Sequence, residues 1–137
     1  MSRLLFIILV CLSGSLVAQD LRELSDEEKK FSILFEDRDQ DFGEVKKGEI
    51  KETTFKFENN GTEDIKIELV SGCECTTLDW PRKVIRPGEK GEISAIFDSS
   101  KKEASETVEI DINFENIDPE SGYNRFEIVS YKFVLIP

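Results

Sequence analysis

Two cysteines separated by a single residue, Cys73 and Cys75, are the side chains of this sequence best suited to chemistry. In an extended strand, residues two apart point to the same side, and their α-carbons lie roughly 6.5 Å apart, near the upper limit for a disulfide. A bridge between them therefore requires a local bend of the backbone. Its small ring would contribute little stability.

Three interpretations of the pair remain open. The sulfurs form a structural pair, as packed thiols or a passive bridge; or the bridge is a reversible redox pair; or two thiolates bind a soft metal ion, for which Cu(I) is the best match. Glu74 places a carboxylate between the cysteines, and Trp80 is the aromatic candidate for a contact near them. Packing is favoured over a ligand platform for Trp80, because buried aromatic rings mostly serve packing.

The composition excludes several classes of function. The chain has 137 residues, a formal net charge of −11 and no histidine. Without histidine there is no Ser-His-Asp or Cys-His machinery and no His-ligated zinc, and no pair of carboxylates stands out as an alternative. The acidic balance argues against nucleic acid and anionic membranes, which bind Lys/Arg-rich surfaces. We therefore expect a non-enzymatic protein.

The N-terminus has the layout of a secretory signal peptide. Arg3 precedes an apolar run over residues 4–12, and Ala18 ends the segment, so we expect a signal peptide over residues 1–18. Cys11 follows Val10, whereas lipid attachment requires a small preceding residue, and export is favoured over a lipoprotein. The product is expected to be periplasmic or secreted, with a charged leader over residues 19–30 and no transmembrane segment in the mature chain.

The remaining residues, 31–137, are expected to form one all-β domain. Apolar and polar residues alternate over several short segments, and Asn, Gly and Pro lie between them, which is typical of an immunoglobulin-like antiparallel β-sandwich of seven to eight strands. The expected strands cover residues 31–35, 41–45, 50–58, 65–69, 91–97, 108–114 and 126–136. The expected core is Phe55, Phe57, Ile67, Ile93, Phe97, Ile110, Ile112 and Phe133.

Residues 41–99 resemble the bacterial domain-of-unknown-function 1573 family. The motifs that carry the resemblance are Phe42-Gly43, residues 55–61, Cys-x-Cys-Thr at 73–76, Trp80-Pro81, residues 85–88 and Phe97-Asp98. The resemblance implies an immunoglobulin-like sandwich related to ASH and major-sperm-protein-like domains, and a location in the cell envelope. The family usually has Cys-Gly-Cys, and here Glu74 replaces the glycine.

Together these observations predict an exported interaction or structural module of the bacterial cell envelope. The partner would be another envelope protein, bound by pairing with an edge strand of the sandwich. The alternative function is a small thiol-redox or Cu(I)-binding protein that acts through Cys73 and Cys75.

Overall fold

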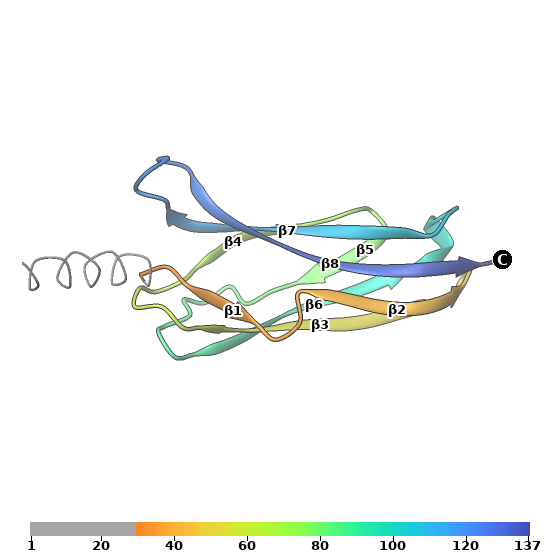
Figure 1. Cartoon of the computed structure of the whole chain (residues 1–137), viewed down its shortest axis with the longest axis horizontal. Helices are drawn as coiled ribbons and strands as arrows, with labels where there is room; N and C mark the ends of the chain where they lie inside the picture. Colours follow the sequence, from red (N-terminus) through yellow and green to blue (C-terminus); the bar gives the residue numbers. More distant parts are fainter. Residues whose placement is uncertain (1–29) are drawn as a thin grey trace, which may run out of the picture.

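The computed structural model describes residues 30–137, which form two four-stranded sheets packed face to face (Figure 1). The first sheet has the order β1 (Ile33–Phe35), β3 (Ile50–Asn59), β6 (Lys90–Asp98), β5 (Thr76–Asp79). The second has the order β2 (Asp39–Lys46), β8 (Asn124–Ile136), β7 (Glu106–Ile117), β4 (Ile67–Ser71). One short 3-10 helix, η1 (Ser99–Lys101), follows β6.

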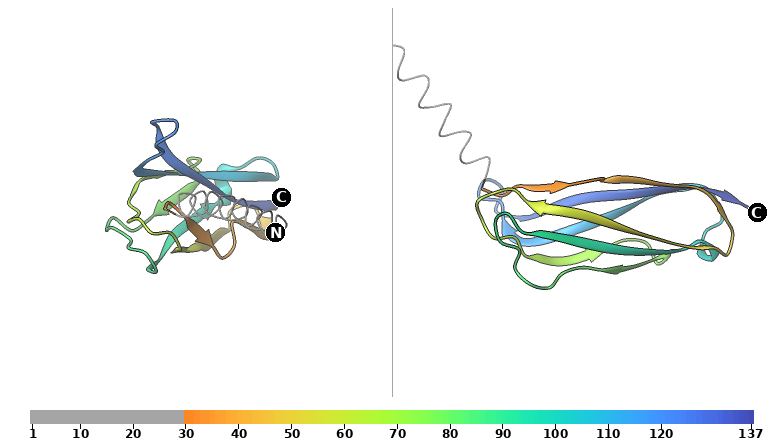
Figure 2. Two further views of the ribbon diagram at one scale, coloured as in Figure 1. Left: turned by 60° about the vertical axis from the view of Figure 1, so that its left-hand side comes forward. Right: turned by 90° about the horizontal axis from the view of Figure 1, so that it is seen from below.

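This topology is that of an immunoglobulin-like sandwich, as the sequence predicted. The first sheet corresponds to strands A, B, E and D of that fold, and β4, β7 and β8 correspond to C, F and G. Figure 2 shows the strands of both sheets running along the long axis of the domain. The expected signal peptide, Cys11 and nearly all of the charged leader lie outside the described residues.

Alternation of apolar and polar residues places the core between the sheets. Along β7, Val108, Ile110, Ile112 and Phe114 face inward and are buried. All eight side chains expected in the core are at most 3% exposed, which confirms that prediction. Tyr131 on β8 is also fully buried, and its ring packs at centroid distances of 5.1 Å against both Phe42 and Phe97.

One pair of strands differs from the expected antiparallel arrangement. β2 pairs in parallel with β8, with Asp39 opposite Ser130 and Lys46 opposite Ile136. The chain passes from β1 in the first sheet to β2 in the second without reversing direction (Figure 1), so β2 meets β8 in parallel. Gln40 Nε2 donates a hydrogen bond to the Thr54 carbonyl (2.9 Å), which links β2 to the first sheet.

One strand was not predicted from the sequence, and several strands begin two residues away from their predicted starts. β5, only four residues long, was not expected, and it pairs with β6 at the edge of the first sheet. The strand expected over residues 65–69 begins at Ile67, and Ile65 instead forms an isolated bridge with Ile85. Within residues 30–137, no helix has the length and apolar character needed to span a bilayer.

Candidate functional site

Cys73 and Cys75 lie where the chain crosses from one sheet to the other. β4 ends at Ser71 in the second sheet and β5 begins at Thr76 in the first, and residues 72–75 connect them. The Thr76 N–H donates to the Cys73 carbonyl at 3.1 Å, which closes a turn around Glu74. The Asp98 N–H donates to the Cys75 carbonyl at 2.9 Å and ties the turn to the end of β6.

The two cysteines form a disulfide with α-carbons 5.2 Å apart. The strand geometry assumed from the sequence is wrong here, because both residues lie in the turn rather than in a strand. The turn supplies the bend that bridging requires, and it does so with Glu74 in the central position instead of glycine. In the oxidised state neither sulfur is a thiolate, so Cu(I) binding would require prior reduction of the bridge.

The two sulfurs have unequal surroundings. Cys75 is only 4% exposed, whereas Cys73 is partly exposed at the rim of the core. The Cys75 N–H donates to Cys73 Sγ at 3.2 Å. An attacking group from solvent therefore reaches Cys73 more readily than Cys75.

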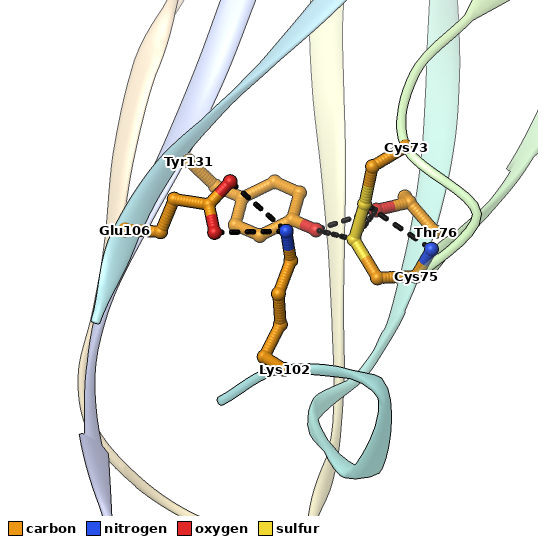
Figure 3. A network of polar contacts seen from close by, with 6 residues as sticks. All are labelled: Cys73, Cys75, Thr76, Lys102, Glu106 and Tyr131. Carbon is orange, nitrogen blue, oxygen red and sulfur yellow. Dashed lines mark hydrogen bonds and ion pairs between the residues drawn. A yellow bond between two sulfur atoms is a disulfide. The ribbon is translucent and has the colours of Figure 1, made fainter. Parts of the chain in front are cut away.

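Two hydroxyl groups face the bridge from β5 and β8 (Figure 3). Thr76 Oγ1 lies 3.3 Å from Cys75 Sγ and 3.6 Å from Cys73 Sγ. The Tyr131 hydroxyl lies 3.5 Å from Cys75 Sγ and is hydrogen-bonded to Thr76 Oγ1. The sequence named Thr76 only as part of the Cys-x-Cys-Thr motif, and it did not indicate Tyr131, which is 56 positions from Cys75 and reaches the bridge only in the fold.

Burial keeps the Tyr131 hydroxyl protonated, and charged groups lie near it. Burial raises the pKa of the Tyr131 hydroxyl above its usual value, the hydrogen bond with Thr76 opposes that shift, and the negative charge of Glu106 adds to it. Lys102 Nζ pairs with both carboxylate oxygens of Glu106 at 2.9 Å. Lys101 Nζ donates to the Glu74 carbonyl at 3.2 Å, so one cation borders the turn itself.

The structure places the other two predicted site residues differently. Glu74 is exposed at the tip of the turn, between the cysteines. Trp80 follows the far end of β5 from Cys75, so the whole strand separates it from the bridge. Its ring packs against the core, and the Arg82 guanidinium lies over it, 3.6 Å from the ring centroid.

A second surface of interest, not predicted from the sequence, lies on the outer face of the second sheet. We call it the β4-β7-β8 patch: Leu69, Phe126 and Ile128, which are 49%, 63% and 40% exposed. Cross-strand register puts Leu69 opposite Asn113 and Asn113 opposite Phe126, while Ile128 lies opposite Asp111. The sequence could have indicated this patch, because Phe126 and Ile128 lie at even positions and Tyr131 and Phe133 at odd positions. Residues of the two sets point to opposite faces of a strand, so β8 carries apolar residues on both faces.

An acidic border runs along β7 beside this patch. Asp111 and Glu109 point to the same outer face, opposite Ile128 and Ser130. Within residues 30–137 neither carboxylate is paired with a lysine or arginine. Also within this range, no group of three or more Cys, Asp or Glu is arranged to hold a metal ion.

The fold and the crossing turn define an immunoglobulin-like sandwich with a Cys-x-Cys bridge between its sheets. The family model described as "Protein of unknown function (DUF1573)" matches residues 33–126, and the chain belongs to that family. The resemblance found in the sequence is therefore confirmed. No curated protein matches this chain.

Solved structures share the fold at low identity. A protein of unknown function from Porphyromonas gingivalis W83 matches with a TM-score of 0.62 and 18% identity, covering 78% of this chain and 48% of that one. Thus the chain spans about half the length of that relative. The VesB protease of Vibrio cholerae matches with a TM-score of 0.59 and 10% identity, covering 86% of this chain and 36% of that one. The ASH/PapD-like domain 7 of human CEP192 matches with a TM-score of 0.58 and 12% identity, covering 79% and 87%.

Proposed function

We propose that this chain is an exported, non-enzymatic binding module of the bacterial cell envelope. The observation that carries the proposal is the β4-β7-β8 patch, whose exposed apolar side chains come from two strands on either side of β7. Exposed apolar residues gathered on one face and bordered by polar ones are typical of protein interaction surfaces, and here Asn113 of β7 lies between Leu69 and Phe126. Export is supported by the secretory layout of residues 1–18.

The chemistry of the surface supports one kind of partner. An apolar centre next to the unpaired carboxylates of Asp111 and Glu109 fits a protein surface with an apolar centre and a basic border. Such a partner would bind more weakly as salt is added, because the charges at the border are exposed.

The face of the sheet fits this role better than β4, the edge strand beside the patch. Edge-strand pairing was expected from the sequence, and β4 is the edge next to the patch. However, β4 has only five residues and its register shifts between Ile67 and Leu69, which shortens the ladder that a partner strand could extend. Short and irregular edges resist pairing with another strand.

A matched pair of substitutions tests the proposal. Ile128→Asp introduces a charge into the patch, and Ile96→Asp introduces the same charge on the outer face of the first sheet, where Ile96 is 39% exposed against 40% for Ile128. Cross-linking in intact envelopes followed by mass spectrometry should recover one partner with the wild type and with Ile96→Asp. We expect Ile128→Asp to lose that partner and Asp111→Lys to weaken it.

The outcome that contradicts the proposal is equally specific. Recovery of the same partner with Ile128→Asp as with Ile96→Asp would exclude the patch as the binding surface. A partner lost equally with both variants would indicate unfolding or non-specific capture, and circular dichroism of the purified variants separates those two causes.

A further inference from the structure

We propose that the Cys73–Cys75 disulfide is a thiol–disulfide exchange site that accepts electrons from a dithiol, with Cys73 as the sulfur attacked and Cys75 as the leaving thiolate. This goes beyond the binding role, because it concerns a different part of the surface. Its basis is the asymmetry of the turn: one sulfur is reachable from solvent, and the other is buried against two hydroxyl groups.

Accessibility selects the sulfur that is attacked. Thiol–disulfide exchange requires a thiolate to approach one sulfur along the line of the S–S bond. Cys75 is 4% exposed and faces Tyr131, so that approach is blocked from its side. Cys73 is partly exposed, and attack there expels Cys75.

The hydroxyl cluster stabilises the leaving group. Thr76 and Tyr131 hydroxyls are bonded to each other, which uses one of their two protons. In either orientation of that bond the second proton remains available to the Cys75 sulfur, 3.3 Å from Thr76 Oγ1 and 3.5 Å from the Tyr131 hydroxyl. Hydrogen bonds to a thiolate lower its pKa, and a leaving thiol of lower pKa departs faster. Burial raises the pKa of Tyr131, so its hydroxyl keeps its proton.

The electrons and protons balance in two steps. A thiolate of the dithiol forms a bond to Cys73 Sγ, the Cys73–Cys75 bond breaks, and Cys75 leaves as a thiolate. The second thiol of the dithiol, as its thiolate, then attacks the dithiol's first sulfur, which is bonded to Cys73 Sγ, and Cys73 leaves as a thiolate. The dithiol is oxidised to a disulfide, and Cys73 and Cys75 take up its two protons and two electrons.

The small size of the ring closed by the disulfide also favours exchange over a structural role. The bridge joins residues separated by two positions in the sequence. Closing so short a loop removes little entropy from the unfolded chain. Opening it therefore leaves the domain folded, as an exchange site requires.

The rate at which dithiothreitol reduces the bridge of the full chain tests the role of the Thr76 and Tyr131 hydroxyls. Samples quenched with acid and labelled with a maleimide give the rate of reduction. A hydrogen bond from a hydroxyl group to a thiolate lowers the pKa of that thiol by about one unit, and only part of that change appears in the rate at which the thiolate leaves. We expect the Thr76→Val/Tyr131→Phe double variant to slow reduction about threefold, because it removes the one hydroxyl proton available to Cys75, and each single variant to slow it less, because the remaining hydroxyl can still donate to the sulfur. Thr77→Val and Tyr123→Phe remove exposed hydroxyls of the same kinds away from the bridge and should leave the rate unchanged.

A second measurement uses the wild-type chain and does not depend on how the variants fold. Glutathione forms a mixed disulfide, iodoacetamide blocks the released thiol, and tandem mass spectrometry locates each group. We expect glutathione on Cys73 and the carbamidomethyl group on Cys75.

Three results would overturn the proposal. They are glutathione predominantly on Cys75, equal rates for the Thr76→Val/Tyr131→Phe variant and its Thr77→Val/Tyr123→Phe control, or reduction that occurs only as urea unfolds the domain. Loss of the envelope partner in Ile128→Asp tests only the binding proposal, so either proposal can fail while the other stands.

Discussion

Reducing the Cys73–Cys75 bridge should lower the free energy of unfolding only slightly. The bridge closes a loop of three residues, 73–75. The chain-entropy relation for a loop of that size gives a loss of about 1.6 kcal/mol at 25 °C, against roughly 3 kcal/mol for a fifteen-residue loop. For a domain of this size, 1.6 kcal/mol corresponds to a fall in Tm of roughly 6–10 °C.

Urea unfolding followed by circular dichroism measures this difference. The oxidised chain and the chain reduced with a phosphine should show similar slopes against urea and midpoints that differ by the amount above. A Cys73→Ala/Cys75→Ala variant with and without the phosphine controls for effects of the reductant itself. A loss above about 4 kcal/mol would refute the reasoning, because it would make the bridge a structural staple of the kind common in small secreted domains.

Three further predictions concern packing, pH and export. Gly91→Ala should cost about 1–3 kcal/mol, because its Cβ would lie 2.5 Å from Phe57 Cζ in the core, whereas Gly72→Ala, with no neighbour closer than 3.5 Å, should be nearly neutral in urea unfolding. Hydrogen bonds from the hydroxyl and backbone N–H of Ser100 lower the pKa of Asp98. The stability that Asp98 contributes is therefore present above its pKa in the unfolded chain and is lost as pH falls through the lowered pKa of the folded state. In Asp98→Asn, the free energy of unfolding should fall less steeply as the solution is made acidic. N-terminal sequencing of the exported protein should begin at residue 19, and a start at Met1 would exclude cleavage.

Much of the fold was predictable because alternation is a local signal. Residues 106–117 alternate strictly between buried and exposed over most of their length, and β7 follows that pattern. β5 escaped prediction because four residues carry too little alternation to distinguish a strand from a loop. The parallel pairing of β2 with β8 was not predictable either, since it depends on contacts between residues about ninety positions apart.

The candidate site was predictable only in part, for a related reason. The spacing of Cys73 and Cys75 identified the sulfurs, and the sequence also implied that bridging needs a bend. What the sequence did not reveal is which sulfur is buried. That property comes from Tyr131, which reaches the bridge from β8 across the core, and from Asp98, whose N–H holds the Cys75 carbonyl. Local spacing specifies which atoms can react, whereas the asymmetry between them arises from tertiary contacts.

The patch and the bridge are connected through β4, and the size of the ring that the disulfide closes decides whether they are coupled. β4 carries Leu69 of the patch and ends at Ser71, two residues before Cys73. The Cys75 N–H donates to Cys73 Sγ, but the β4–β7 ladder and the Thr76 N–H to Cys73 carbonyl bond, which also hold this strand and its turn, use no sulfur atom. Breaking the S–S bond therefore leaves those contacts in place and frees only a three-residue ring. A long disulfide loop would make partner binding depend on oxidation state. In this protein the outer face should keep its shape in both states, so binding at the patch and exchange at the turn are expected to operate independently.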